Sequence, residues 1–314
     1  MKEFLLKRLG ITLLMMITVS FLLFVMLESN VEALAITVLG QYSSVEQREL
    51  WLVENGFREP FFQRYFMWLI NFFRGEWGDS LLFQTPVYEL VMLRLGNTGM
   101  LTGAALLFLV PVSLLLGVIA GIKEGSLIDR FVSVFSIFTT SVPDYASAVL
   151  MSFIFVFTLK WLPGTSSMIS GFSWLELILP TLVLSLYAKG YLTRMTRASM
   201  AEVMQTHYVR TAFMKGVPYW RVVFKHALRN SMIAPFTAIM LQIPWLLSGV
   251  VVVETYFAYK GFGDLLLKAS LANDIFLIEA CAMISVIVVV ATQLISDVAY
   301  VVLNPKITFT GGEE

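Results

Sequence analysis

Long apolar stretches, each nearly free of charged side chains, recur along the chain and are separated by more polar segments. The hydrocarbon core of a bilayer is about 30 Å thick, and crossing it takes about 20 apolar helical residues, because backbone polar groups there must bond within the helix. The pattern predicts an all-α integral membrane protein with six transmembrane helices. The fourth is the weakest, because Lys189 and Arg194 lie near its end. The expected spans are residues 9–27, 97–122, 131–158, 175–195, 231–253 and 279–303.

Composition narrows the function classes. With 58% hydrophobic and 14% charged residues, a soluble globular protein is excluded, and a formal net charge of zero gives no indication of a nucleic-acid partner. The lone Cys281 excludes a disulfide framework within the chain, and His207 and His226 have no metal-binding cluster beside them. No phosphate-binding loop and no hydrolase motif occurs. We therefore expect no catalytic residue, metal or cofactor on this chain.

The distribution of charge predicts the orientation, because lysine and arginine near membrane spans favour the cytoplasmic side. Residues 189–229 carry eight basic side chains and one acid, whereas residues 28–94 carry nine acids and five arginines. We expect the first segment and both termini in the cytoplasm, and the second segment outside. The first span also resembles a secretory signal, but its apolar run is long and two glutamates separate it from the small residues at 33–35, which favours a retained anchor.

The outer segment, residues 28–94, contains a predicted helix at 59–74. This helix begins with a proline, is rich in aromatic residues and is flanked by arginines. Aromatic rings and arginines favour the headgroup level of a membrane, so a helix lying at the outer interface is one interpretation. A helix packed on the spans is the other, and the sequence does not separate them.

The cytoplasmic segment, residues 196–229, has the pattern of two short helices joined by a turn. Residues 200–204 favour a helix, Gly216 is a typical helix stop, and Pro218 is a typical start of the next helix. Such a surface could dock into a groove of a partner. A basic loop that only obeys the orientation rule explains the residues equally well.

Residues 208–216 read Y-V-R-T-A-F-M-K-G, and H-A-L-R-N follows at 226–230. This order resembles the cytoplasmic loop of ATP-binding-cassette (ABC) importer permeases, specifically the dipeptide, oligopeptide and nickel branch. The general importer loop has a glutamate where Arg210 stands, and Glu202 lies eight residues earlier instead. Weaker similarity to the first of the two permeases of such systems covers nearly the whole chain, at residues 7–9, 74–80, 253–263 and 297–306.

The resemblance implies one permease of an importer in the bacterial inner membrane. It would form half of a translocation path with a second homologous permease. Two separate ATPase subunits would bind ATP and Mg, and a periplasmic binding protein would deliver a peptide, or else nickel, an oligosaccharide or an opine-type solute. The residues expected to contact the ATPase are Glu202, Tyr208, Arg210, Thr211, Ala212, Lys215 and Gly216, and those expected to contact the binding protein are Glu76, Asp79, Lys260 and Asp264.

Asp144 is the one charge well inside an expected span, about 21 Å along a continuous helix from Arg130. An ionisable group at that depth is costly unless it faces a cavity or a partner, and the adjacent Pro143 can kink the helix. Two interpretations stay open. Asp144 and Pro143 line the substrate path and favour cationic or hydroxyl-rich solutes, or Asp144 pairs with a basic residue of the second permease. An ion-coupled secondary transporter is a remote alternative, since it predicts inverted repeats and paired acids.

Overall fold

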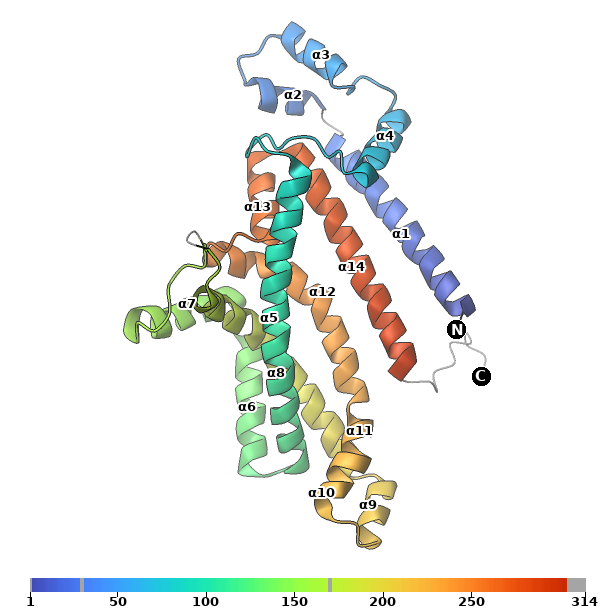
Figure 1. Ribbon diagram of the computed structural model, residues 1–314, viewed down its shortest axis with the longest axis vertical. Coiled ribbons are helices and arrows are strands. Elements are labelled where there is room, and N and C mark those ends of the chain that lie inside the picture. Colours follow the sequence, from blue (N-terminus) through green and yellow to red (C-terminus); the bar gives the residue numbers. More distant parts are fainter. Residues whose placement is uncertain (1, 29–30, 169–170, 304–314) are drawn as a thin grey trace. The chain divides into compact units, whose positions relative to one another are not determined.

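The computed structural model describes residues 2–28, 31–168 and 171–303, and every regular element in these ranges is helical. The chain divides into two compact units, residues 1–97 with 261–294 and residues 98–260 with 295–314. Helix α5 (Val87–Ile122) belongs to the first unit up to Asn97 and to the second beyond it. The all-α prediction is therefore confirmed, and each unit is described separately below (Figure 1).

The first unit holds the outer segment and its neighbours in sequence. Its helices are α1 (Lys2–Glu28), α2 (Val31–Leu39), α3 (Val45–Glu54), α4 (Phe61–Arg74), the start of α5, α13 (Phe262–Ala272) and most of α14 (Ile275–Leu303). Its apolar core joins α4, α5, α13 and α14 through Phe72, Val91, Leu265 and Cys281, all of which are buried. A bidentate ion pair between Arg58 and Glu49 ties the turn after α3 back to that helix, and its hydrogen bonds hold the pKa of Glu49 below its usual range.

Helix α4 is the helix predicted at residues 59–74, and it ends at Gly75, whose φ of 80° is the left-handed conformation that closes many helices. One face packs on α1, where Tyr65 meets Phe24 with ring centroids 5.5 Å apart and the Ser20 and Tyr65 hydroxyls are 2.8 Å apart. The other face stays exposed and apolar, with Phe62 and Phe73 more than 60% accessible. The contacts with α1 agree with a helix packed on a predicted span, and a position at the outer membrane interface stays a prediction.

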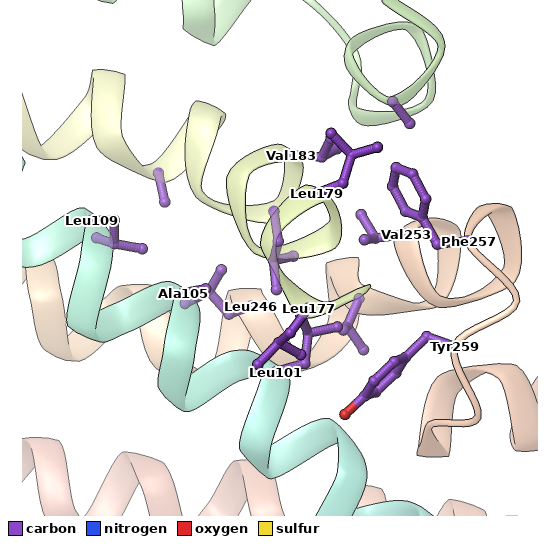
Figure 2. Close-up of a cluster of buried hydrophobic side chains, with 14 of the residues drawn as sticks. Leu101, Ala105, Leu109, Leu177, Leu179, Val183, Leu246, Val253, Phe257 and Tyr259 are labelled. Carbon is purple, nitrogen blue, oxygen red and sulfur yellow. The ribbon is translucent and has the colours of Figure 1, made fainter. Parts of the chain in front are cut away.

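The second unit is a bundle around α8. It comprises the rest of α5, α6 (Leu127–Ser141), α7 (Asp144–Ser152), the π-helical turn η1 (Phe153–Thr158), α8 (Trp174–Met204), α9 (His207–Met214), α10 (Tyr219–Arg221), the π-helical turn η2 (Val222–Ala227), α11 (Leu228–Ser231) and α12 (Ile233–Tyr256). Figure 2 shows its core, where α5, α8 and α12 bring together Leu101, Ala105, Leu179, Val183, Leu246 and Val253 with the following Phe257 and Tyr259.

The expectation of one continuous span over residues 131–158 is wrong. Helix α6 ends at Ser141 and α7 begins at Asp144, with a bend of 107° between them. Val142 adopts an extended conformation, because the ring of Pro143 disfavours the helical region for the residue before it and Pro143 has no N–H to continue the ladder. This segment is either a broken span or a re-entrant loop.

The fourth predicted span is part of a longer helix than the sequence indicated. Helix α8 runs on to Met204, well past the expected end at residue 195. Among the described residues, three helices are long and apolar enough to cross a membrane, or four if the bent pair of α6 and α7 is one span. Shorter apolar stretches occur at Gly10–Met26 and Ile233–Ile243. The count of six spans therefore stays a prediction.

Candidate functional site: the cytoplasmic helix pair, the bend and the outer loop

Residues 200–204, expected in the first short helix of the segment, belong instead to the end of α8, and two separate short helices flank the predicted turn. Helix α9 ends at Met214, Gly216 has a φ of 73°, and Pro218 precedes the first residue of α10. Only glycine adopts such a left-handed conformation without strain, so Gly216 makes the turn. In Figure 1, α9 and α10 lie beside α11 at the end of α8.

One face of α9 is anchored and the other is open. Val209 is buried together with Met200 of α8 and Val223 of η2, and the half-buried Ala212 packs against this cluster. The Tyr208 hydroxyl accepts a hydrogen bond of 2.9 Å from the Asn230 amide. The remaining residues expected to contact an ATPase, Glu202, Arg210, Thr211, Lys215 and Gly216, are exposed.

Aromatic side chains that the sequence analysis left without a role extend this surface. Phe213, Tyr219, Trp220 and Phe224 form a chain of ring contacts with centroids 5.6 to 5.9 Å apart, and all four are more than a third exposed. Exposed aromatic residues mark interaction surfaces more often than exposed charges do. The sequence already contains a signal for this surface, because aromatic residues occur at 219–224 in a segment that is expected to face water.

The C-terminal part of α8 is held to the start of α6 and to the turn before it. The Arg197 guanidinium donates from Nε to Asp129 Oδ1 at 2.9 Å and from Nη2 to Oδ2 at 2.7 Å. Asp129 is buried and also accepts from the backbone N–H of Gly125 at 2.9 Å, and Arg197 lies 3.4 Å from Glu124. A bidentate pair of this kind fixes orientation as well as distance. The helix that leads into α9 is thereby held at a defined angle, a link that the sequence analysis missed.

The bend between α6 and α7 places Asp144 at the first residue of α7, half-buried, with Pro143 exposed before it. The estimate of its depth from a continuous helix is therefore wrong, because α6 ends three residues earlier. A second acid of this unit, Glu254 near the end of α12, is completely buried and accepts a hydrogen bond from the Thr98 hydroxyl of α5. The sequence analysis used Glu254 only as part of a motif.

The residues expected to contact a binding protein have different surroundings. Glu76 and Asp79 are exposed in the loop before α5. Asp264 is buried in the first turn of α13 and bound to Lys268 at 2.7 Å, so its assignment as a docking residue is wrong. Lys260 is exposed and belongs to the second unit, whereas the other three residues belong to the first.

Asp274, at the start of α14, organises the loop that carries Asp79. Its Oδ2 accepts from the Ser80 hydroxyl at 2.6 Å and from the Leu82 N–H at 3.0 Å, and its Oδ1 accepts from the Leu277 N–H at 3.3 Å. Beside this loop lies a cavity of about 440 Å³, lined by α4, the turn at residues 55–59, the loop at 76–78 and the first turn of α14.

Comparison with known proteins gives consistent similarity over the whole length. Residues 113–309 match the family described as binding-protein-dependent transport system inner membrane component. A relative from Brucella abortus, whose name describes a peptide transport system permease protein, is 33% identical over 98% of this chain and 100% of its own length. The oligopeptide transport system permease protein AppB of Bacillus subtilis is 33% identical over 85% of this chain and 86% of its own. The glutathione transport system permease protein of Pectobacterium atrosepticum is 30% identical over 95% of each chain.

Proposed function

Because this chain belongs to the family of binding-protein-dependent transport system inner membrane components, a multi-pass permease of the inner membrane, we propose that it forms half of the translocation path of a peptide importer. A second, homologous permease would supply the other half. Relatives named for peptide, oligopeptide and glutathione transport favour a peptide or peptide-like solute over nickel, an oligosaccharide or an opine. A periplasmic binding protein would deliver the solute, with Glu76 and Asp79 as the exposed acids on the outer loop.

The observation that carries the proposal is the exposed helix–turn–helix formed by α9 and α10 at the end of α8. The sequence has no phosphate-binding loop, so we assign ATP and Mg to two separate ATPase subunits and assign the contact with them to this surface. The contact comprises the open face of α9 with Arg210, Thr211 and Lys215, the Gly216 turn, and Tyr208, Ala212 and Glu202 beside it. Movement of the ATPase would reach the spans through α8, because Asp129 and Arg197 hold that helix to the turn between α5 and α6.

Reversal of one charge on this surface tests the proposal. Arg210→Glu and Arg130→Glu make the same change at two exposed arginines expected on the cytoplasmic face, one on α9 and one in the first turn of α6. We expect Arg210→Glu to reduce uptake of a defined mixture of tri- to pentapeptides at least tenfold, in cells that carry the whole importer, while Arg130→Glu stays near wild type. Immunoblots of the membrane fraction control for insertion.

The variant Gly216→Pro tests the same surface independently. Proline cannot adopt a φ of 73°, so the turn must change and uptake should be lost with the chain still in the membrane. Unchanged uptake in both Arg210→Glu and Gly216→Pro would remove the assignment of this surface to ATPase contact. A wild-type importer that takes up none of the peptides would remove the peptide assignment while leaving the permease family intact.

A further inference from the structure

We infer that helix α4 lies in the outer leaflet of the membrane and that an exposed apolar stripe on it contacts lipid acyl chains. The stripe consists of Phe62, Phe66, Ile70 and Phe73. The inference goes beyond the proposed function, because it holds for any transported solute. It assigns a partner to a surface that the packing of α4 on α1 leaves uncovered.

The stripe is continuous along one side of α4. Its members are four, four and three residues apart, so they fall on one side of a helix with 3.6 residues per turn. Each side chain is between 47% and 69% exposed. Three are phenylalanines and one is isoleucine, so the stripe offers no polar group over a length of about 16 Å. An exposed apolar surface of this kind marks contact with a membrane or with another protein.

The polar side of α4 is turned toward the interior of the first unit. Arg64 and Asn71 lie on the opposite side of the helix from the stripe and are half-buried. Both line the cavity of about 440 Å³ that the loop at 76–78 and the first turn of α14 complete. A helix at the surface of a water-soluble protein has the reverse arrangement, with its apolar side on the core and its polar side in solvent. The medium on the stripe side of α4 is therefore apolar.

The contacts between α4 and α1 lie at the depth of hydrocarbon. Residues 9–27 of α1 carry no charged side chain and form the first predicted span. Tyr65 of α4 contacts Ser20 and Phe24, which precede the end of α1 by eight and four residues, about 12 and 6 Å along the helix. Half of a hydrocarbon core is about 15 Å thick. With the segment after α1 on the outer side, α4 meets α1 within the outer half of the core.

Hydrocarbon fits the stripe better than a protein partner does. Phe62 stacks on Phe21 of α1 with ring centroids 6.5 Å apart, so the stripe continues the surface of the predicted span. A soluble binding protein approaches from the water above that depth. Helices that pair within a membrane meet through small or polar residues, whereas the stripe has only bulky apolar side chains. Because α4 ends just before the loop of Glu76 and Asp79, lipid contact fixes the height of that loop above the bilayer.

The experiment measures the medium around single nitroxide spin labels on the whole importer, in vesicles of phosphatidylethanolamine and phosphatidylglycerol. The native Cys281 is replaced by alanine, and Phe66→Cys and Ile70→Cys place labels in the stripe. Tyr42→Cys, at a fully exposed position in the loop after α2, is the reference for water. Phe72→Cys, at a buried position of α4 itself, is the reference for protein interior. Peptide uptake by each labelled variant controls for folding.

The label's collisions with oxygen and with a polar nickel chelate distinguish the three media. Oxygen is enriched in hydrocarbon and the chelate is excluded, so the ratio of oxygen to chelate collisions at both stripe positions should be about tenfold above that at Tyr42→Cys. Oxygen collisions there should also exceed those at Phe72→Cys. Frequent chelate collisions would show that the stripe faces water, and rare collisions with both reagents would show that protein covers it. Either result would overturn the lipid contact and leave the assignment to peptide import intact.

Discussion

The close contact between α5 and α8 is the feature whose disruption the structure predicts most sharply. A Cβ atom added at Gly117 would lie 2.5 Å from Cβ of Thr196 and 2.8 Å from the carbonyl oxygen of Thr193. One added at Gly121, a turn further along α5, would lie 2.7 Å from Cβ of Met200. Carbon atoms in contact are normally about 3.5 to 4.0 Å apart, so alanine at either position requires the helices to separate by about 1 Å. The atoms that would clash at both positions are backbone or Cβ atoms, and a change of side-chain rotamer cannot move them away.

Gly103 of the same helix provides a matched control, because apart from its own helix turn no atom of the described residues lies within 4 Å of a Cβ atom built there. Overpacking costs about 1–3 kcal/mol, and alanine in place of glycine gains up to about 1 kcal/mol of helix stability. Gly117→Ala should therefore destabilise the chain by about 1–2 kcal/mol, and Gly103→Ala should leave it unchanged or slightly more stable. The double variant of Gly117 and Gly121 should lose more than either single variant.

The measurement is the temperature at which half of the detergent-solubilised chain is lost from the monodisperse peak in size-exclusion chromatography. A loss of 1 kcal/mol corresponds to about 2–4 °C for a unit of this size. We expect Gly117→Ala to lower the midpoint by several degrees relative to Gly103→Ala. Equal midpoints for the two variants would refute the argument that α5 and α8 meet through these glycines.

Three further outcomes follow from single carboxylates. Asp129→Ala leaves the Arg197 guanidinium without its bidentate partner, which should lower the free energy of unfolding by about 2 kcal/mol and lower the same thermal midpoint. A midpoint equal to wild type would show that this ion pair does not stabilise the fold. Asp274→Ala frees the Ser80 hydroxyl and the loop before α5, so cleavage of that loop by added protease should accelerate, and an unchanged cleavage rate would contradict the anchoring role. Asp144→Asn should reduce uptake of cationic peptides more than that of neutral ones, and an equal loss of both would remove charge selection at this position.

Local features of the chain were predictable from the sequence because their causes are local. Hydrophobic stretches long enough for a bilayer predicted an all-α membrane protein, and the glycine and proline at residues 216 and 218 predicted the end of α9 and the start of α10. The helix over 61–74 was predicted in the same way. Each of these depends on backbone preferences or on residue periodicity, which act within a few positions of the chain.

The errors came from treating hydrophobicity as if it determined the path of the backbone. The run at residues 131–158 is mostly apolar and has Asp144 as its one charge, yet the backbone turns by 107° before Asp144, because a proline restricts the residue that precedes it more strongly than hydrophobicity favours a straight helix. Helix α8 continues past Arg194 because basic side chains do not interrupt the backbone hydrogen bonds of a helix.

Polar groups far apart in the sequence are brought together by tertiary structure alone. Asp129 and Arg197 are 68 residues apart and meet, as do Ser80 and Asp274 at a separation of 194 residues. Lys189, which lies between Asp129 and Arg197 in sequence, has its ammonium near the rings of Phe108 and Phe135. The sequence by itself determined a polytopic permease, and its assignment of an acidic and a basic segment to opposite sides of a membrane stays a prediction. Only tertiary packing determined which distant charges meet, as Asp129 and Arg197 do, because ion pairing depends on distances that the chain sets through tertiary contacts.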